Sequence, residues 1–368
     1  MGIFASAEPL INKFRHPRLL NFSATDPFEY EITVWPGHQS WDDVHSFGHY
    51  RYSVDWSQKF LAKTDLTRSF LAPNVQSFPI RAPDPVRGTL FIPPGPGPFQ
   101  VVIDSFGGAG NCIEMRAALF ARHGYLSLAL AFYRYLDLNT DRATDVRIDY
   151  WQKAINFMLN HAKAKRDRVI LTSNCLSTPA VFSIATRDPR VKLAICINPP
   201  FFINLDDKSE FLVPPEQGKT ASDWIRHKPE YRFQKGFVKM TRTETVHPSV
   251  LVMNEAPLTH THEPKIVFLI GAEDRNQPNR EIVAVARNHF AKYGKSHQIE
   301  SILVPGQGHM IEPCYTPMVS AATLDREIKG MKDLGGYPKT HIENQEFAWN
   351  AVLQLLHQYR DRELESKI

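Results

Sequence analysis

The stretch RVILTSNCLSTPAVFSIA, residues 168–185, joins an apolar, β-branched run to a helical pattern through the residues SNCLS (173–177). A buried strand that turns sharply into a helix raises the residue at the turn above the edge of a sheet, where it can act as a nucleophile. The usual pattern at such a turn is Gly-x-Ser-x-Gly, because small flanking residues relieve crowding, and here it is Ser-x-Cys-x-Ser. The turn alone does not decide the role of Cys175, since a cysteine at the end of a buried strand is more often a packing residue.

Further apolar runs with strand character follow one another from Phe99 onward, with helical patterns between several of them. The predicted strands are VVIDSF (101–106), YLSLALAF (125–132), RVILTS (168–173), LAICIN (193–198), KIVFLI (265–270) and ESILVP (300–305), and helices are predicted over 113–124 and 149–165. Strands that alternate with helices of this length predict a mostly parallel sheet with helices on both faces.

An acidic residue and a histidine follow the last two of these strands. Asp274 ends the loop GAED (271–274), and His309 ends the loop GQGH (306–309). The carboxyl ends of parallel strands meet at one edge of a sheet, and the chain order nucleophile, acid, histidine is that of α/β-hydrolases. We therefore predict an α/β-hydrolase fold with Cys175, Asp274 and His309 as a catalytic triad.

A glycine-rich loop, DSFGGAGN (104–111), follows the strand VVI and is called the glycine loop below. Such a loop lets backbone N–H groups point at a substrate carbonyl, and we predict an oxyanion hole made by the N–H groups of Leu176, Phe106 and Gly107. The alternative is a phosphate-binding loop, but the stretch lacks both GxGxxG and GK[ST].

The domain organisation is predicted from a change in sequence pattern near residue 85. Residues 1–85 contain short β-like pieces separated by Pro, Gly and Asp, and they predict a small β-rich domain. Residues 86–368 predict the catalytic domain, in which a less regular segment over about 200–262 is interpreted as a lid-like insertion.

The amino-acid composition gives information about the ligands and the cellular location. The 43 basic residues barely exceed the 39 acidic ones, which gives no argument for nucleic acid. No apolar run approaches the roughly 20 residues of a membrane span. The four cysteines form no CxxC pair and suggest a reducing compartment. His260 and His262 could chelate a metal, but no third ligand is evident, so we predict no metal and no cofactor.

The last residues, Ser366-Lys367-Ile368, differ from the peroxisomal address Ser-Lys-Leu only in the final side chain. We therefore expect the peroxisomal import receptor as a partner and the peroxisome as the location. Without that address the chain would be cytoplasmic.

Four segments resemble the family of acyl-CoA thioesterases and bile acid-CoA:amino acid N-acyltransferases. They are VRGTLFIPPGPGPF (86–99) into VVIDSFGG (101–108), RAALFARHGYLSLALAFYRYLDL (116–138), SNCLS (173–177) and PGQGHMIEPCYTP (305–317). The resemblance covers residues 60–360 and implies a β-sandwich domain ahead of the hydrolase domain. It also implies the same triad. Two departures stand out, since Ser177 replaces the second glycine of the turn and the N-terminal region is shorter than a full sandwich.

The resemblance implies an enzyme that processes acyl-CoA thioesters through an acyl-enzyme on Cys175, with coenzyme A as part of the substrate. Thioesterases of the family carry serine and its amino-acid transferases carry cysteine, but a cysteine acyl-enzyme can also be hydrolysed. The acceptor of the acyl group, which we expect to be a fatty acyl group, therefore stays open between water and an amino acid. Two other hypotheses remain, a cysteine hydrolase of the dienelactone type and a binding protein on a catalytically decayed scaffold.

Overall fold

The computed structural model describes residues 23–34, 36–37, 61–108, 110–200, 202–205, 209–213, 231–234, 237–240, 251–316, 318–319, 321–323 and 331–365. The C-terminal Ser366-Lys367-Ile368 lies outside the described residues, as do most of residues 1–60.

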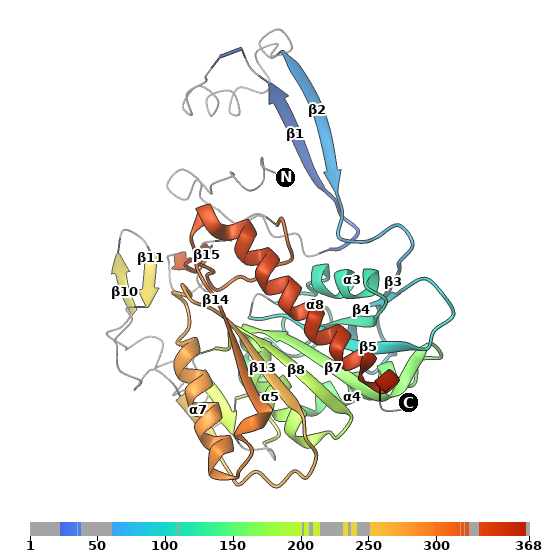
Figure 1. Ribbon diagram of the computed structural model, residues 1–368, viewed down its shortest axis with the longest axis vertical. Coiled ribbons are helices and arrows are strands. Elements are labelled where there is room, and N and C mark those ends of the chain that lie inside the picture. The colour runs from blue at the N-terminus through green and yellow to red at the C-terminus, as the bar shows by residue number, and fades with distance from the viewer. Residues whose placement is uncertain are drawn as a thin grey trace.

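An eight-stranded sheet runs through the centre of the molecule in the order β14-β13-β8-β7-β5-β6-β4-β3 (Figure 1). Only β4 runs against its two neighbours, β3 and β6, while the other pairs are parallel. The strands are β3 (Gln76–Ile80), β4 (Arg87–Ile92), β5 (Phe99–Ser105), β6 (Leu126–Ala131), β7 (Ala164–Asn174), β8 (Val191–Ile197), β13 (Lys265–Gly271) and β14 (Ile299–Val304). This topology confirms the α/β-hydrolase fold predicted from the sequence.

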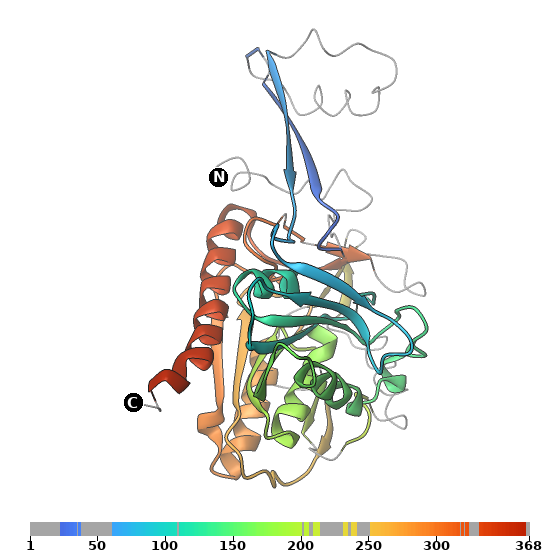
Figure 2. The ribbon, with the colours of Figure 1, turned by 90° about the vertical axis from the view of Figure 1, so that its right-hand side faces the viewer.

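Helices cover both faces of the sheet because alternate strand residues point to opposite sides. Val101 and Ile103 face one side, where α4 (Asp149–Leu159), α5 (Thr178–Arg187) and α7 (Asn279–Lys292) pack. Val102 faces the other, which is covered by α3 (Met115–Arg122) and by the long α8 (His341–Glu365). In Figure 1, α8 crosses in front of the strands, and Figure 2 shows it along one side of the body.

The predicted elements of this domain are found with small shifts at their ends. The helix expected over 149–165 was predicted too long, because α4 ends at Leu159 and Ala164 already pairs with Phe99 in the sheet. Short 3₁₀ helices connect elements of the domain: η2 (Ala143–Asp145), η3 (Cys175–Ser177), η5 (Ser296–Gln298) and η6 (Pro338–Thr340).

Two small sheets are built largely from the insertion predicted over about 200–262. One pairs β9 (Phe202–Leu205) with β12 (Leu251–Glu255), and the other has the order β10-β11-β16-β15. Its strands are β10 (Tyr231–Gln234), β11 (Phe237–Met240), β15 (Ala321–Thr323) and β16 (Met331–Asp333). The described parts of the insertion are therefore more regular than the sequence indicated, and its role as a lid stays a prediction.

A hairpin of β1 (Phe28–Val34) and β2 (Ala62–Arg68) projects from the body in both views (Figures 1 and 2). Arg68, at its base, donates hydrogen bonds to the backbone carbonyls of Cys314 (2.7 Å) and Tyr315, which lie in the segment that follows His309. The β-rich domain predicted over 1–85 stays a prediction, although β3, which lies within those residues, belongs to the central sheet.

No helix among the described residues is long and apolar enough to cross a membrane.

Trp349 joins α8 to α3 and offers a test of this packing. The side chain is 1% exposed, and its ring centroid lies 5.9 Å from that of Phe120. Replacing a buried tryptophan by alanine leaves a cavity, so Trp349→Ala should lower the free energy of unfolding by about 3–5 kcal/mol. Urea unfolding followed by circular dichroism measures this change.

Two matched variants show whether packing is the cause. The indole N–H of Trp349 has no hydrogen-bond partner among the described residues, so Trp349→Phe, which keeps an aromatic ring, should cost much less than Trp349→Ala. Phe347 lies on the same helix and is 51% exposed. Phe347→Ala should change stability by no more than about 0.5 kcal/mol. Equal losses in the Trp349→Ala and Phe347→Ala variants would contradict the packing of α8 described above.

Candidate active site

Cys175 occupies the turn between β7 and α5. The strand ends at Asn174, a short 3₁₀ turn covers Cys175–Ser177, and the helix begins at Thr178. Cys175 has φ = +50°, in the left-handed region that non-glycine residues rarely adopt and that marks functional sites when the surrounding structure enforces it. The side chain is partly exposed at the carboxyl edge of the sheet. This is the geometry of the turn predicted from SNCLS.

Ser177 fits the position that usually holds glycine, because its φ of −78° and ψ of −16° are ordinary helical values. Its hydroxyl oxygen lies 2.8 Å from the carbonyl oxygen of Ser105 and 3.1 Å from that of Asn174, and it accepts a hydrogen bond from the Asn174 N–H at 3.2 Å. A hydroxyl has one proton to donate, and the shorter contact favours Ser105. The second serine therefore takes part in the turn and does not disrupt it.

The predicted acid and histidine lie side by side. Nδ1 of His309 is 2.7 Å from Oδ2 of Asp274, and both side chains are buried. Asp274 also accepts hydrogen bonds from the N–H groups of Asn276 (2.7 Å) and Gln277 (3.0 Å), and from the side chain of Asn279 (2.6 Å). A buried carboxylate needs such partners, and the bond to Nδ1 fixes the ring orientation, leaving Nε2 for chemistry.

The His309 ring also interacts with Cys175. Burial lowers the pKa of His309, but the negative charges of Asp274 and Cys175, together with hydrogen bonds to both, outweigh burial and raise that pKa to about 10. The structure thus brings the three predicted residues into one chain of contacts, Asp274 to His309 to Cys175. Their catalytic roles stay predictions.

Asn198 is a site residue that the sequence analysis missed. It lies directly after β8 and is fully buried. Its Nδ2 donates to the carbonyl oxygens of Gly308 (3.1 Å) and His309 (2.7 Å), while its Oδ1 accepts from the Gly271 N–H (2.8 Å) and the Asn279 side chain (2.9 Å). It therefore ties the loop of the acid to the loop of the histidine. A polar residue at the carboxyl end of the run LAICIN is the signal that could have identified it.

The glycine loop contacts the nucleophile directly. A Cβ atom added at Gly107 would lie 2.8 Å from Cβ of Cys175 and 3.2 Å from the carbonyl oxygen of Asn174. Only glycine allows so close an approach of backbone to backbone. Gly107 thus lies against Cys175, and Leu176 directly follows Cys175 in the chain. The oxyanion hole predicted from Leu176, Phe106 and Gly107 stays a prediction.

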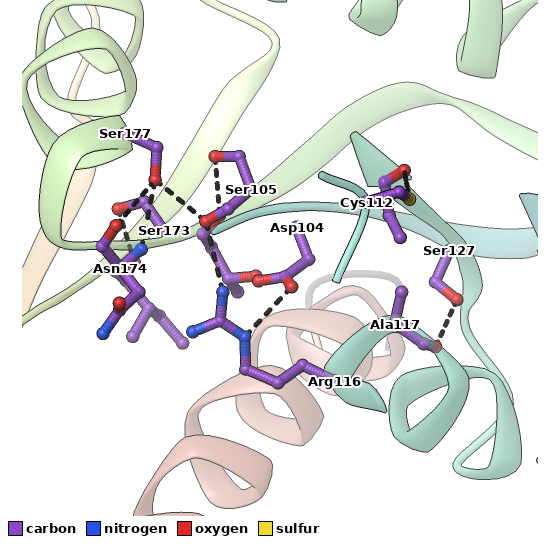
Figure 3. Close-up of polar contacts among 12 residues, drawn as sticks. Asp104, Ser105, Cys112, Arg116, Ala117, Ser127, Ser173, Asn174 and Ser177 are labelled. Atoms are coloured by element: carbon purple, nitrogen blue, oxygen red, sulfur yellow. Dashed lines mark hydrogen bonds and ion pairs between the residues drawn. The ribbon is translucent and has the colours of Figure 1, made fainter. Parts of the chain in front are cut away.

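A buried ion pair lies at the start of the glycine loop, between Asp104 and Arg116 (Figure 3). Nε of Arg116 is 3.0 Å from Oδ2 of Asp104, and neither side chain is exposed. Burial raises the pKa of Asp104, which the charge of Arg116 and the hydrogen bond from Thr172 counteract. Arg116 also donates to the Ser105 carbonyl (3.2 Å) and lies 4.9 Å from the centre of the Phe106 ring. The pair connects α3 with the start of the glycine loop.

The other three cysteines lie in different surroundings. Burial raises the pKa of Cys112 and of Cys196 to about 12, and it also raises the pKa of Cys314. A raised pKa disfavours the thiolate, which is the reactive form. Cys175 is the cysteine whose side chain faces the histidine ring.

The histidines considered as metal ligands have other partners. Nε2 of His260 lies 2.9 Å from the side-chain oxygen of Gln298, and Nε2 of His262 lies 2.9 Å from the carbonyl oxygen of Ala185. In the part of the chain that the structure describes, no group of three or more His, Cys, Asp and Glu side chains is placed to hold a metal ion.

Comparison with known proteins gives a consistent result over most of the chain. Residues 146–361 match the family model described as BAAT / Acyl-CoA thioester hydrolase C terminal. The chain is 30% identical to the bile acid-CoA:amino acid N-acyltransferase of Mus musculus, over 82% of this chain and 70% of that protein. It is also 30% identical to the peroxisomal succinyl-coenzyme A thioesterase of Mus musculus, over 91% of this chain and 74% of that protein.

Among solved structures, an esterase from Pyrococcus furiosus matches with a TM-score of 0.41 and 14% identity, over 63% of this chain and 82% of that one. A likeness at this level carries no statement about activity. The family model and the two mouse relatives identify the family of this chain. The model spans more than half of the chain and includes the turn, the acid and the histidine described above. The chain belongs to the family of acyl-CoA thioester hydrolases and bile acid-CoA:amino acid N-acyltransferases.

Proposed function

We propose that the chain cleaves acyl-CoA thioesters through an acyl-enzyme on Cys175. The observation that carries the proposal is the contact of His309 with both Asp274 and Cys175, at the carboxyl edge of the sheet. Two relatives support the substrate class, since one is named for bile acid-CoA and the other for succinyl-coenzyme A. The acyl group of this chain's own substrate is proposed to be a fatty acyl group.

In the resting enzyme, an imidazolium on His309 stabilises a thiolate on Cys175. The raised pKa of His309 favours this ion pair near neutral pH. The thiolate attacks the thioester carbonyl, and the developing oxyanion accepts hydrogen bonds from the N–H groups of Leu176, Phe106 and Gly107. When the intermediate collapses, the bond from carbon to the coenzyme A sulfur breaks, and the leaving thiolate takes the proton from His309.

The second half-reaction uses the neutral imidazole left on His309. It accepts a proton from the attacking water or amino group, the bond between the acyl carbon and Cys175 breaks, and the ion pair is restored. Asp274 holds the ring and stabilises its positive charge in both halves. The acceptor is water for a thioesterase or an amino acid for an N-acyltransferase, and the relatives include both kinds.

The nucleophile is tested by the mass of the intact protein. Incubation with a fatty acyl-CoA at low acceptor concentration should add one acyl group to the wild type and none to Cys175→Ala, with release of coenzyme A lost in that variant. Cys314→Ser, which removes the other partly exposed thiol, is the matched control and should keep the adduct. Unchanged release of coenzyme A in Cys175→Ala would refute the assignment. Adding glycine, taurine or water to the isolated adduct then identifies the acceptor.

The ion pair predicts how the acylation rate depends on pH. The folded-state pKa of His309 is raised to about 10, so the imidazolium is present below that value and lost as the pH rises through it. The rate should therefore be maintained across neutral pH and fall above about pH 10. Asp274→Asn removes a charge that raises this pKa, so the fall should move to lower pH while the maximal rate also drops. Single-turnover rates of coenzyme A release, measured as a function of pH, give both the maximal rate and the pH at which the rate falls. If the rate of Asp274→Asn fell at the same alkaline pH as that of the wild type, the role of Asp274 would be contradicted.

The location of the protein is a separate part of the proposal. Ser366-Lys367-Ile368 resembles the peroxisomal address, and one relative is named as peroxisomal. A fluorescent protein that ends in the last residues of this chain should collect in peroxisomes, because the import receptor reads the terminal tripeptide. Removal of Ile368 should make the signal diffuse. A diffuse signal from both proteins would leave the chain in the cytoplasm.

A further inference from the structure

The carbonyl oxygen of Ser105 is held from two sides at the point where β5 enters the glycine loop (Figure 3). The Ser177 hydroxyl lies 2.8 Å from it, and Nη2 of Arg116 lies 3.2 Å from it. The three side chains are 0–1% exposed, so no water competes for this oxygen from bulk solvent. The nucleophile turn and helix α3 therefore both bind the same backbone carbonyl.

This carbonyl belongs to the same peptide unit as the N–H of Phe106. A trans peptide is planar, and its N–H and C=O groups point in opposite directions. Two donors that fix the direction of the Ser105 C=O therefore also fix the direction of the Phe106 N–H. That N–H is one of the donors proposed for the oxyanion hole, and an oxyanion donor acts through its orientation before the reaction starts.

The second donor is itself held rigidly. Arg116 is paired with Asp104, which accepts a further hydrogen bond from Thr172 on β7. The guanidinium also stacks on the Phe106 ring, with 4.9 Å between its carbon and the ring centroid. Ser177, unlike Arg116, connects the Ser105 carbonyl to the nucleophile turn. Its hydroxyl also forms hydrogen bonds with the backbone of Asn174, the residue before the nucleophile.

We propose that Ser177 is a positioning residue whose hydroxyl aligns the Ser105–Phe106 peptide with Cys175, so that serine at this position replaces glycine with a gain in function. The proposal rests on the acyl-enzyme mechanism above. It differs from the alternative that Ser177 is tolerated only because it is small. In that case glycine, the usual residue of such a turn, would serve equally well or better.

The test compares two reactions of the same thiol in Ser177→Gly and Ser177→Ala. Attack on an acyl-CoA forms an oxyanion, whereas alkylation by iodoacetamide displaces iodide from a saturated carbon and forms none. Loss of alignment should slow single-turnover acylation by about tenfold or more, because complete removal of an oxyanion donor costs about 10²–10³-fold and misalignment removes only part of its effect. Alkylation of Cys175, followed by mass spectrometry of its peptide, should keep its rate and its pH dependence, because the contact with His309 is untouched.

Ser127→Ala is the matched control. Ser127 is also fully buried, and its hydroxyl donates to the Ala117 carbonyl at 2.6 Å, away from the glycine loop (Figure 3). This variant loses one buried hydrogen bond and should leave both rates unchanged. A tenfold loss of acylation in Ser127→Ala would mean that loss of any buried hydroxyl slows the enzyme, which would overturn the proposal.

Three results in the Ser177 variants would also overturn it. The first is acylation at the wild-type rate in Ser177→Gly, and the second is an equal loss of acylation and alkylation, which would indicate a displaced nucleophile. The third is failure of both variants to fold, because the hydroxyl would then hold the fold and not the alignment. Failure of the proposed function is recognised separately, since the wild type would then form no acyl adduct on Cys175.

Discussion

The candidate active site depends on one buried hydrogen bond, between the carboxylate of Asp274 and the ring of His309. A carboxylate taken out of water is costly unless several donors replace the lost hydration. Four donors surround Asp274, two from the backbone and two from the side chains of Asn279 and His309. The arrangement keeps the ring in one orientation, and in that orientation the ring also interacts with Cys175.

The loops that carry this bond are held together by close backbone contacts. A Cβ at Gly271 would lie 2.3 Å from the Gly308 carbonyl oxygen, and one at Gly308 would lie 2.5 Å from the backbone of Gly335. Such distances leave no room for side chains, so the acid loop and the histidine loop pack backbone against backbone. Asn198 then satisfies the polar groups that this packing buries. Glycine provides the proximity and asparagine provides the hydrogen bonds.

Much of this could be predicted from the sequence, because the signals were local. The strand-to-helix run at 168–185 and the acid and histidine at strand ends were enough for the fold and for which residues come together. The contacts of Asn198 and of Ser177 could not be predicted, because their partners are far away in the sequence and meet them only through sheet order. Asn198 lies 73 positions from Gly271 and 111 from His309, and Ser177 lies 72 positions from Ser105. The same limit applies to the insertion, whose strands pair with residues beyond His309.

The base of the hairpin and the residues just after it contact the candidate active site at two places. Arg68 binds the carbonyls of Cys314 and Tyr315, and Phe70 packs against a small apolar cluster that contains Phe106 and Met310. Phe106 belongs to the glycine loop, and Met310 directly follows the histidine. The glycine loop and the segment that follows His309 therefore both pack against the same short stretch of chain, residues 68–70. A substitution at Arg68 or Phe70 would therefore be felt both in the segment that follows His309 and in the glycine loop, although both residues precede the hydrolase sheet in the chain.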